Sequence, residues 1–285
     1  MTSLPKFSVL GSGPTVLMLH GIGGGHLAFA PQVETFAQAG YRAVAWDMPG
    51  YGHSAPIEPY SFKGLAQSCI LLIEALMASD ANSHAHSHSE ERSGIILLGH
   101  SMGGMVAQEV IARRPDLISQ LVLSGTSPAF GRKPDGTVAE AWSAKFVSDR
   151  QAPLDAGKSM ADVAALLVPQ MVGPGALPEG VNLAQHCMAQ VPAATYRRAL
   201  EALVTFDRQA DMARIVAPTL LVAGEFDKSA PPSVMKAMAQ AIPGSQYAEL
   251  PGVGHLTNME APDEFDAVVL SFLASTYRPR PQKMH

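Results

Sequence analysis

The serine at position 101 has a sequence context that could make it a nucleophile. It is the central residue of the pentapeptide Gly99-His100-Ser101-Met102-Gly103, which has the pattern G-x-S-x-G. Four apolar residues precede the pentapeptide and apolar residues at helical spacing follow it, which predicts a strand that turns directly into a helix. Such a bend strains the serine backbone and requires small residues two positions before and two after it. The hydroxyl is then held beyond the sheet edge, at a helix N-terminus that stabilises developing negative charge.

The pentapeptide alone is weak evidence, since it describes an ordinary Gly-Ser turn equally well. A carboxylate and an imidazole occupy comparable places later in the chain: Asp227 lies four residues past the expected strand 219–223, and His255 lies five residues past the expected strand 246–250. Parallel strands bring their carboxyl ends to one edge of a sheet, so these loops can converge on one crevice. We expect His255 to take the proton from Ser101 and return it to the leaving group, while Asp227 orients the imidazole. The order Ser, Asp, His is the one expected for a nucleophile at such a turn.

Acyl transfer also needs hydrogen-bond donors for the charge that develops on the carbonyl oxygen. One donor is predicted to be the backbone N–H of Met102, directly after the nucleophile. The other is predicted in the glycine-rich run 20–25, from the N–H of Ile22 or, as an alternative, of Gly23. Backbone groups perform this task, so the side chains at these positions carry little information.

Other polar residues near strand ends have competing interpretations. Glu225 is the main rival for the acid, because it stands nearer the strand end and is expected to sit deeper. Asp47 ends a strand before a Pro- and Gly-rich segment, which favours a structural role in a turn. His20 and His100 are best interpreted as packed histidines that bond the backbone.

One pattern points to a different class of protein. The residues Gly23 to Ala28 satisfy G-x-G-x-x-A after a strand, with Asp47 about 20 residues further on, as in a dinucleotide-binding unit. This interpretation leaves Ser101, Asp227 and His255 without a role, whereas the hydrolytic one uses the same glycines as an oxyanion loop. We therefore expect no cofactor.

Strands alternate with helices around these motifs. Strands are expected near 16–19, 41–46, 95–98, 121–123, 219–223 and 246–250, and helices near 31–39, 61–77, 105–111, 232–241 and 262–274. Between residues 128 and 211 the strand signal disappears, and helices are expected near 138–146, 160–168, 183–188 and 196–203. The pattern predicts an α/β fold with a mostly parallel central sheet and helices on both faces. Residues 1–127 and 212–285 would form this core, and residues 128–211 an all-helical cap.

Composition limits the classes of partner. Of 285 residues, 47% are hydrophobic and 16% charged, and the formal charge is −5. This balance offers no basic surface for nucleic acid or for an anionic membrane. No targeting segment and no run of roughly 18 apolar residues is apparent, and Cys69 and Cys187 do not indicate a disulfide framework. We expect a cytoplasmic protein with no nucleic-acid or membrane partner.

The alternating histidines His84, His86 and His88 could in principle bind a metal ion. They lie in a Ser- and Ala-rich loop without nearby cysteines or paired carboxylates, which gives no preorganised ligand set. A solvated insertion is the better interpretation, and no metal site is expected.

Five motifs in this order resemble the α/β-hydrolase family over nearly the whole chain. They are His-Gly-Ile-Gly from residue 20, Asp-Met-Pro-Gly-Tyr-Gly-His-Ser from 47, Gly-His-Ser-Met-Gly-Gly from 99, Gly-Glu-Phe-Asp from 224 and Gly-Val-Gly-His from 252. Within that family the chain looks most like small bacterial ester and lactone hydrolases, including 3-oxoadipate enol-lactonases. The resemblance implies a cofactor-free enzyme whose cap lies over the catalytic edge. Few residues precede the first apolar strand, so an edge strand usual in the family is expected to be short or missing.

The sequence therefore predicts a serine hydrolase that cleaves a carboxylic ester or lactone of a small molecule through an acyl-enzyme. Two alternatives remain: a carbon–carbon hydrolase of vinylogous diketo acids, and a slow-turnover ligand receptor with the same fold. The oligomeric state is open, with a homodimer as one option. The basic cap residues Arg132, Lys133, Lys145, Arg197 and Arg198 could meet a substrate carboxylate, although solvated helix charges are the commoner explanation.

Overall fold

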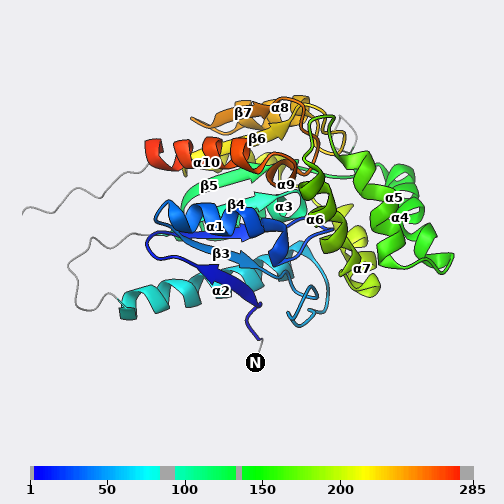
Figure 1. Ribbon diagram of the computed structural model, residues 1–285, viewed down its shortest axis with the longest axis horizontal. Helices are drawn as coiled ribbons and strands as arrows, with labels where there is room; N and C mark the ends of the chain where they lie inside the picture. Colours follow the sequence, from blue (N-terminus) through cyan, green and yellow to red (C-terminus); the bar gives the residue numbers. More distant parts are fainter. Residues whose placement is uncertain (1–2, 84–93, 133–136, 277–285) are drawn as a thin grey trace, which may run out of the picture.

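The computed structural model describes residues 3–83, 94–132 and 137–276, and a seven-stranded sheet runs through its centre (Figure 1). The strand order is β1-β3-β2-β4-β5-β6-β7. β1 is antiparallel to β3, and all the other neighbouring strands are parallel. The strands span Phe7–Leu10 (β1), Thr15–Leu19 (β2), Arg42–Trp46 (β3), Ile95–His100 (β4), Ile118–Ser124 (β5), Thr219–Gly224 (β6) and Gln246–Leu250 (β7).

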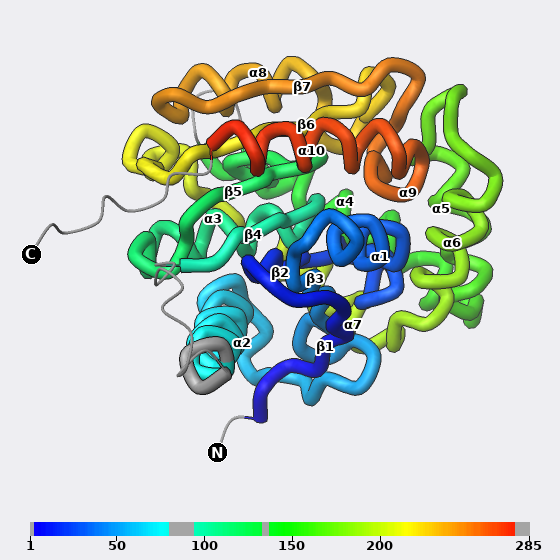
Figure 2. The backbone as a smooth tube through the Cα atoms, turned by 60° about the vertical axis from the view of Figure 1, so that its left-hand side comes forward, coloured from blue at the N-terminus to red at the C-terminus, as the bar shows by residue number. Residues whose placement is uncertain are grey.

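Helices cover both faces of the sheet, as the sequence predicts (Figure 2). Alternate side chains of a strand point to opposite faces, so each face has its own apolar cluster. Leu97 packs on the side of α2 (Phe62–Ser83), α3 (Met102–Arg113) and α8 (Pro232–Ala241). Its neighbour Leu98 packs on the side of α1 (Ala30–Gln38) and α10 (Pro262–Thr276).

The sheet has one more strand than the apolar pattern indicated. β1 has four residues at the sheet edge, and three of them are exposed. An exposed edge strand lacks the buried run that identifies a central strand, and β1 has no such run. The edge strand is therefore short but present.

Four helices lie between β5 and β6, within the segment 128–211, and form one end of the molecule (Figure 1). They are α4 (Glu140–Asp155), α5 (Met160–Met171), α6 (Pro178–Ala189) and α7 (Ala193–Leu203), which we call the cap helices. The two ends of this segment lie side by side where they join the core. Phe130 N–H donates to Phe206 O at 2.9 Å, and Arg208 N–H donates to Pro128 O at 2.7 Å. α6 packs against the 3-10 helix η1 (His26–Phe29) and the short helix α9 (Thr257–Glu260), which places the cap over the carboxyl ends of the strands.

Helix α2 corrects the expectation that no segment approaches the length of a membrane span. Within the described residues, its stretch Phe62–Ser79 is long enough and has a mean hydropathy of 1.3. Lys63, Gln67 and Glu74 interrupt the apolar residues, so this stretch does not stand out in the sequence as a continuous apolar run. Half of this stretch is buried inside the molecule, where α2 packs on α3.

Candidate active site

Ser101 lies at the turn from β4 into α3, where the backbone is strained. Its φ of 53° and ψ of −121° make it the one non-glycine residue with positive φ among the described residues. The predicted need for small neighbours has a direct steric basis. A Cβ on Gly99 would lie 2.5 Å from the carbonyl oxygen of Gly103, and a Cβ on Gly103 would collide with the carbonyl oxygen of Leu19.

The three side chains singled out in the sequence meet at this turn. His255 Nε2 lies 2.9 Å from Ser101 Oγ, and His255 Nδ1 lies 2.8 Å from Asp227 Oδ2. The other Asp227 oxygen accepts from the N–H groups of Ser229 at 2.7 Å and Ala230 at 3.0 Å. Because a carboxylate only accepts, His255 Nδ1 carries the proton and Nε2 is left to accept one from Ser101.

Burial and charge act in opposite directions on this pair. Burial alone lowers the pKa of His255, but the charge of Asp227 and its hydrogen bond outweigh burial, and the pKa lies above the ordinary 6.5. Burial alone raises the pKa of Asp227, but His255 and the two backbone donors hold it below its ordinary 3.8. The pair therefore favours an ionised carboxylate that stabilises a protonated imidazole.

The glycine-rich loop after β2 lies against the nucleophile. A Cβ on Gly21 would be 3.0 Å from Ser101 Cβ and 3.5 Å from its Oγ. Ile22 and Gly23 follow directly, and Met102 is the first residue of α3, whose first N–H groups have no helical acceptor. Met102 follows Ser101 directly, and Gly21, the residue before the predicted donors Ile22 and Gly23, lies against it.

Tyr51 supports the same loop, a role to which no feature of the sequence pointed. Its hydroxyl donates to the carbonyl oxygen of Ile22 at 2.9 Å, and its ring packs edge-on against His20. Its side chain is almost fully buried. A lone tyrosine inside a Pro- and Gly-rich turn cannot be distinguished from a packing residue without the fold.

His20 and His100 are packed histidines with backbone partners, which confirms their interpretation. His20 Nε2 accepts from Met48 N–H at 3.0 Å, so Nδ1 donates to Gly21 O at 2.8 Å. His100 Nε2 donates to the carbonyl oxygen of His255 at 2.8 Å. Burial lowers the pKa of His20 to about 4 and that of His100 to about 3, so both are neutral near pH 7.

Asp47 also has the structural role expected of it. Its Oδ1 accepts from the N–H of His26 at 2.9 Å and lies 3.1 Å from His26 Nδ1. The carboxylate is 2% exposed and fixes the end of β3 to the glycine-rich loop. The Asp47 carboxylate therefore already bonds this chain. It does not stand free, as the acidic residue that binds the ribose in a dinucleotide-binding unit would.

The expectation that Glu225 sits deeper than Asp227 is wrong. Glu225 is exposed and its carboxylate accepts from Gly252 N–H at 2.8 Å, whereas Asp227 is 3% exposed. The turn after β6 directs the two side chains in different directions, which two residues of sequence spacing do not reveal.

The described cap cations proposed to meet a substrate carboxylate already have carboxylate partners on this chain. The pairs are Arg132 with Asp207 at 3.3 Å, Lys145 with Asp149 at 2.7 Å, Arg197 with Asp155 at 2.6 Å and Arg198 with Glu58 at 3.0 Å. Lys133 and the histidines at 84, 86 and 88 lie outside the described residues. Within the described ranges, no group of three or more His, Cys, Asp or Glu side chains is arranged to hold a metal ion.

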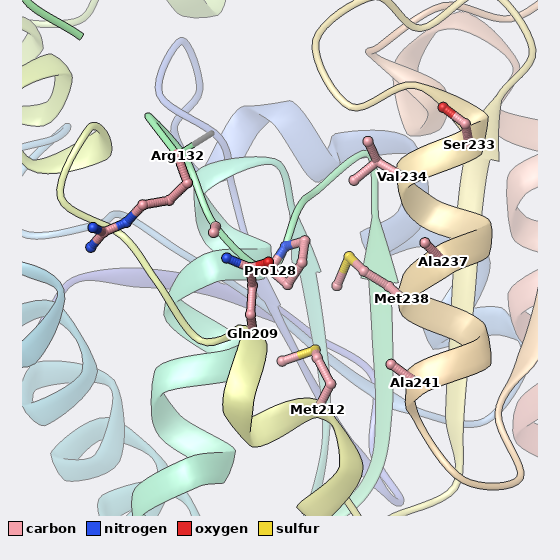
Figure 3. A pocket seen from close by; sticks show the side chains of 10 residues that line it. Pro128, Arg132, Gln209, Met212, Ser233, Val234, Ala237, Met238 and Ala241 are labelled. Carbon is pink, nitrogen blue, oxygen red and sulfur yellow. The ribbon is translucent and has the colours of Figure 1, made fainter. Parts of the chain in front are cut away.

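A groove of about 650 Å³ lies apart from the three side chains (Figure 3). Val234, Ala237 and Met238 of α8 face Pro128 and Met212 across it, and neither Ser101 nor His255 lines it. We therefore do not include the groove in the candidate site.

Comparisons with known proteins agree with this architecture. Residues 14–262 match the family model described as alpha/beta hydrolase fold. A pimeloyl-[acyl-carrier protein] methyl ester esterase from Nitrosospira multiformis is 25% identical over 271 residues, which are 92% of this chain and 95% of that protein.

Two solved structures share the fold. A thermophilic esterase from Thermogutta terrifontis, with malate bound, has a TM-score of 0.80 at 24% identity over 96% of this chain and 94% of that one. An enol-lactonase from Burkholderia xenovorans has a TM-score of 0.75 at 23% identity over 94% of this chain and 96% of that one.

Proposed function

The chain belongs to the α/β-hydrolase family, and on that premise we propose that it is a serine hydrolase that cleaves a carboxylic ester or lactone of a small molecule. The observation that carries the proposal is the imidazole of His255, which is bonded to Asp227 on one side and to the Ser101 hydroxyl on the other. A serine hydroxyl is a weak nucleophile at neutral pH unless a base takes its proton as it attacks. The methyl ester esterase relative supports an ester as the bond cleaved.

Acylation begins when His255 Nε2 takes the proton of Ser101 and Oγ attacks the substrate carbonyl carbon. The resulting imidazolium is stabilised by Asp227, and the tetrahedral oxyanion is bound by the N–H groups of Met102 and Ile22 or Gly23. His255 then gives its proton to the alkoxide oxygen as the carbon–oxygen bond breaks. In a lactone, that alkoxide remains part of the acyl group.

Deacylation repeats these steps with water in place of the serine. His255 Nε2 takes a proton from water, which attacks the acyl carbonyl carbon, and the same N–H groups bind the second oxyanion. Collapse of this intermediate breaks the bond to Oγ, and His255 returns the proton to Ser101.

The first prediction concerns the nucleophile. We expect Ser101→Ala to lower kcat/KM on an activated ester such as p-nitrophenyl butyrate by at least about 10³-fold, because no other group replaces the attacking oxygen. A fluorophosphonate should label the wild-type protein on Ser101, as mass spectrometry of its peptides would show.

Ser148→Ala is the matched control, because Ser148 is an exposed serine on α4 and should leave both readouts unchanged. An Ser101→Ala protein that kept more than a tenth of wild-type turnover would refute the assignment. Parallel assays with simple esters and five- and six-membered lactones would then identify the preferred class of acyl group.

A further inference from the structure

Glu260 is a fully buried carboxylate at the end of α9 that the sequence analysis did not single out. None of its side chain is exposed, and no cation lies within ion-pair distance of it in the described part of the chain. Three backbone N–H groups bond it instead: Gly173 and Gly254 donate to Oε2 at 2.7 Å each, and Leu256 donates to Oε1 at 2.8 Å. A buried charge is costly unless it is hydrogen-bonded, and three short charge-assisted bonds offset that cost.

The three donors come from two different parts of the molecule. Gly254 and Leu256 flank His255 in residues 252–260, which we call the histidine loop. This segment includes α9 and ends at Glu260 itself. Gly173 lies between α5 and α6 in the segment Met171–Leu177, which we call the cap strap. Glu260 Oε2 therefore bonds the cap strap and the histidine loop at a single atom.

Backbone bonds join the same two segments. The N–H of His255 itself donates to Met171 O at 2.7 Å, Gly175 N–H donates to Gly252 O at 2.8 Å, and Leu177 N–H donates to Glu260 O at 3.0 Å. The cap strap and the histidine loop also approach each other so closely that a side chain would not fit at Gly173 or Gly254. A Cβ on Gly173 would be 2.7 Å from Gly254 N, and a Cβ on Gly254 would be 2.6 Å from Gly173 N.

We infer that Glu260 is a positioning residue, which fixes the His255 imidazole toward Ser101 by bonding the histidine loop to the cap strap. The inference rests on the proposed role of His255 as the base. The bonds on both sides of His255 leave its backbone little freedom, and small displacements of a catalytic group reduce the rate strongly. The cap is thereby part of the scaffold that holds the base.

Glu260 also acts on His255 through its charge. Asp227 and Glu260 are the carboxylates that raise the pKa of His255, after burial, which lowers it. His100 faces the same loop from β4, but it is neutral near pH 7, and Ser101 is uncharged. Removal of the Glu260 charge therefore disfavours the imidazolium, and the pKa of His255 falls.

The test is Glu260→Gln, measured as kcat and KM on an activated ester between about pH 5 and pH 9. We expect kcat to fall about 10- to 100-fold with KM within about threefold, because the base is misplaced while the acyl site is intact. On the acidic side of the pH profile kcat rises as His255 loses its proton, and we call this rise the acidic limb. We also expect the acidic limb to move to lower pH by roughly half a pH unit. A purely structural role would lower the active fraction without moving that limb.

Glu264→Gln is the matched control, since Glu264 is an exposed carboxylate four residues further along on α10, and both readouts should stay at wild-type values. Glu260→Asp keeps the charge but shortens the side chain, so kcat should fall while the limb stays in place. If Glu260→Gln does not fold, wild-type kcat in Glu260→Asp overturns the inference.

A folded Glu260→Gln protein with wild-type kcat and an unmoved limb also overturns it. Failure of fluorophosphonate to label Ser101 in the wild-type protein would instead contradict the proposed hydrolase function. The two failures are therefore distinguishable.

Discussion

At the scale of single residues, the two oxygens of Asp227 bond different partners. One accepts from the N–H groups of Ser229 and Ala230, which fixes the carboxylate to its own turn. The other faces His255 Nδ1 and determines which ring nitrogen carries the proton. The exposed Glu225, two residues earlier, has neither function.

This arrangement predicts a large effect of Asp227→Asn. An amide that presents its NH₂ group to Nδ1 favours the ring with its proton on Nε2, which cannot take the proton of Ser101. We expect kcat to fall about 10³- to 10⁴-fold. The acidic limb should also move to lower pH, because the charge that raises the pKa of His255 is lost. Kinetics from about pH 5 to pH 9 check both.

Glu225→Gln is the control for this substitution, and it should preserve rate and pH profile because its amide oxygen can still accept from Gly252. Equal losses in the two variants would mean that the acid has been assigned to the wrong carboxylate.

At the scale of elements, the turn from β4 into α3 depends on close backbone approach. Gly103 has no positive φ, so its requirement for glycine comes from contact alone: the carbonyl of Leu19, at the end of β2, occupies the place of a Cβ. β2 and β4 are adjacent parallel strands, so this contact also holds the glycine-rich loop beside Ser101.

Gly103→Ala should therefore destabilise the fold by about 3 kcal/mol, because backbone atoms cannot move aside as a side chain can. Thermal or urea unfolding gives the free energy directly. Fluorophosphonate labelling should also slow, because the turn that presents Ser101 is displaced.

Gly157→Ala is the comparison, since Gly157 has a φ of 81° with open space around it and pays only the left-handed strain of about 1 kcal/mol. A Gly103→Ala protein no less stable than Gly157→Ala would contradict the steric explanation.

At the scale of the whole molecule, polar contacts from several parts of the cap fasten it to the core. The cap strap bonds the histidine loop, Thr195 Oγ1 donates to Gly50 O at 2.9 Å, and Arg208 pairs with Glu109 of α3. Glu109 is 3% exposed and also accepts from Arg113, so a buried carboxylate joins two partly exposed arginines in a small network of charges.

Arg208→Met should lower the free energy of unfolding by about 1.5–3 kcal/mol, because Glu109 stays buried with one partner fewer. Urea unfolding at neutral pH measures this loss.

Arg214→Ala provides the control at the same junction. The Arg214 side chain is 81% exposed and pairs with Asp211 at 3.4 Å, so its removal should change stability by less than about 0.5 kcal/mol. A similar, small effect of both substitutions would show that the Glu109 network does not hold the cap.

The sequence by itself determined the features that depend on neighbouring residues in the chain. Buried runs specified five of the seven strands, the alternation of strands with helices specified β7, and the glycines around Ser101 specified a strained turn, because these requirements are local. The order of the motifs indicated the family. The catalytic roles of Ser101, Asp227 and His255 remain predictions, although the structure brings the three side chains within bonding distance.

Only the tertiary structure decided features that depend on the direction of a side chain or on contacts between distant segments. It turned Glu225 outward and Asp227 inward, and it brought Gly173 to Glu260 across 87 residues. It also buried half of the apolar stretch of α2. The physical reason is that composition and spacing fix which groups are present, whereas strand register and turn geometry fix which of them can reach one another.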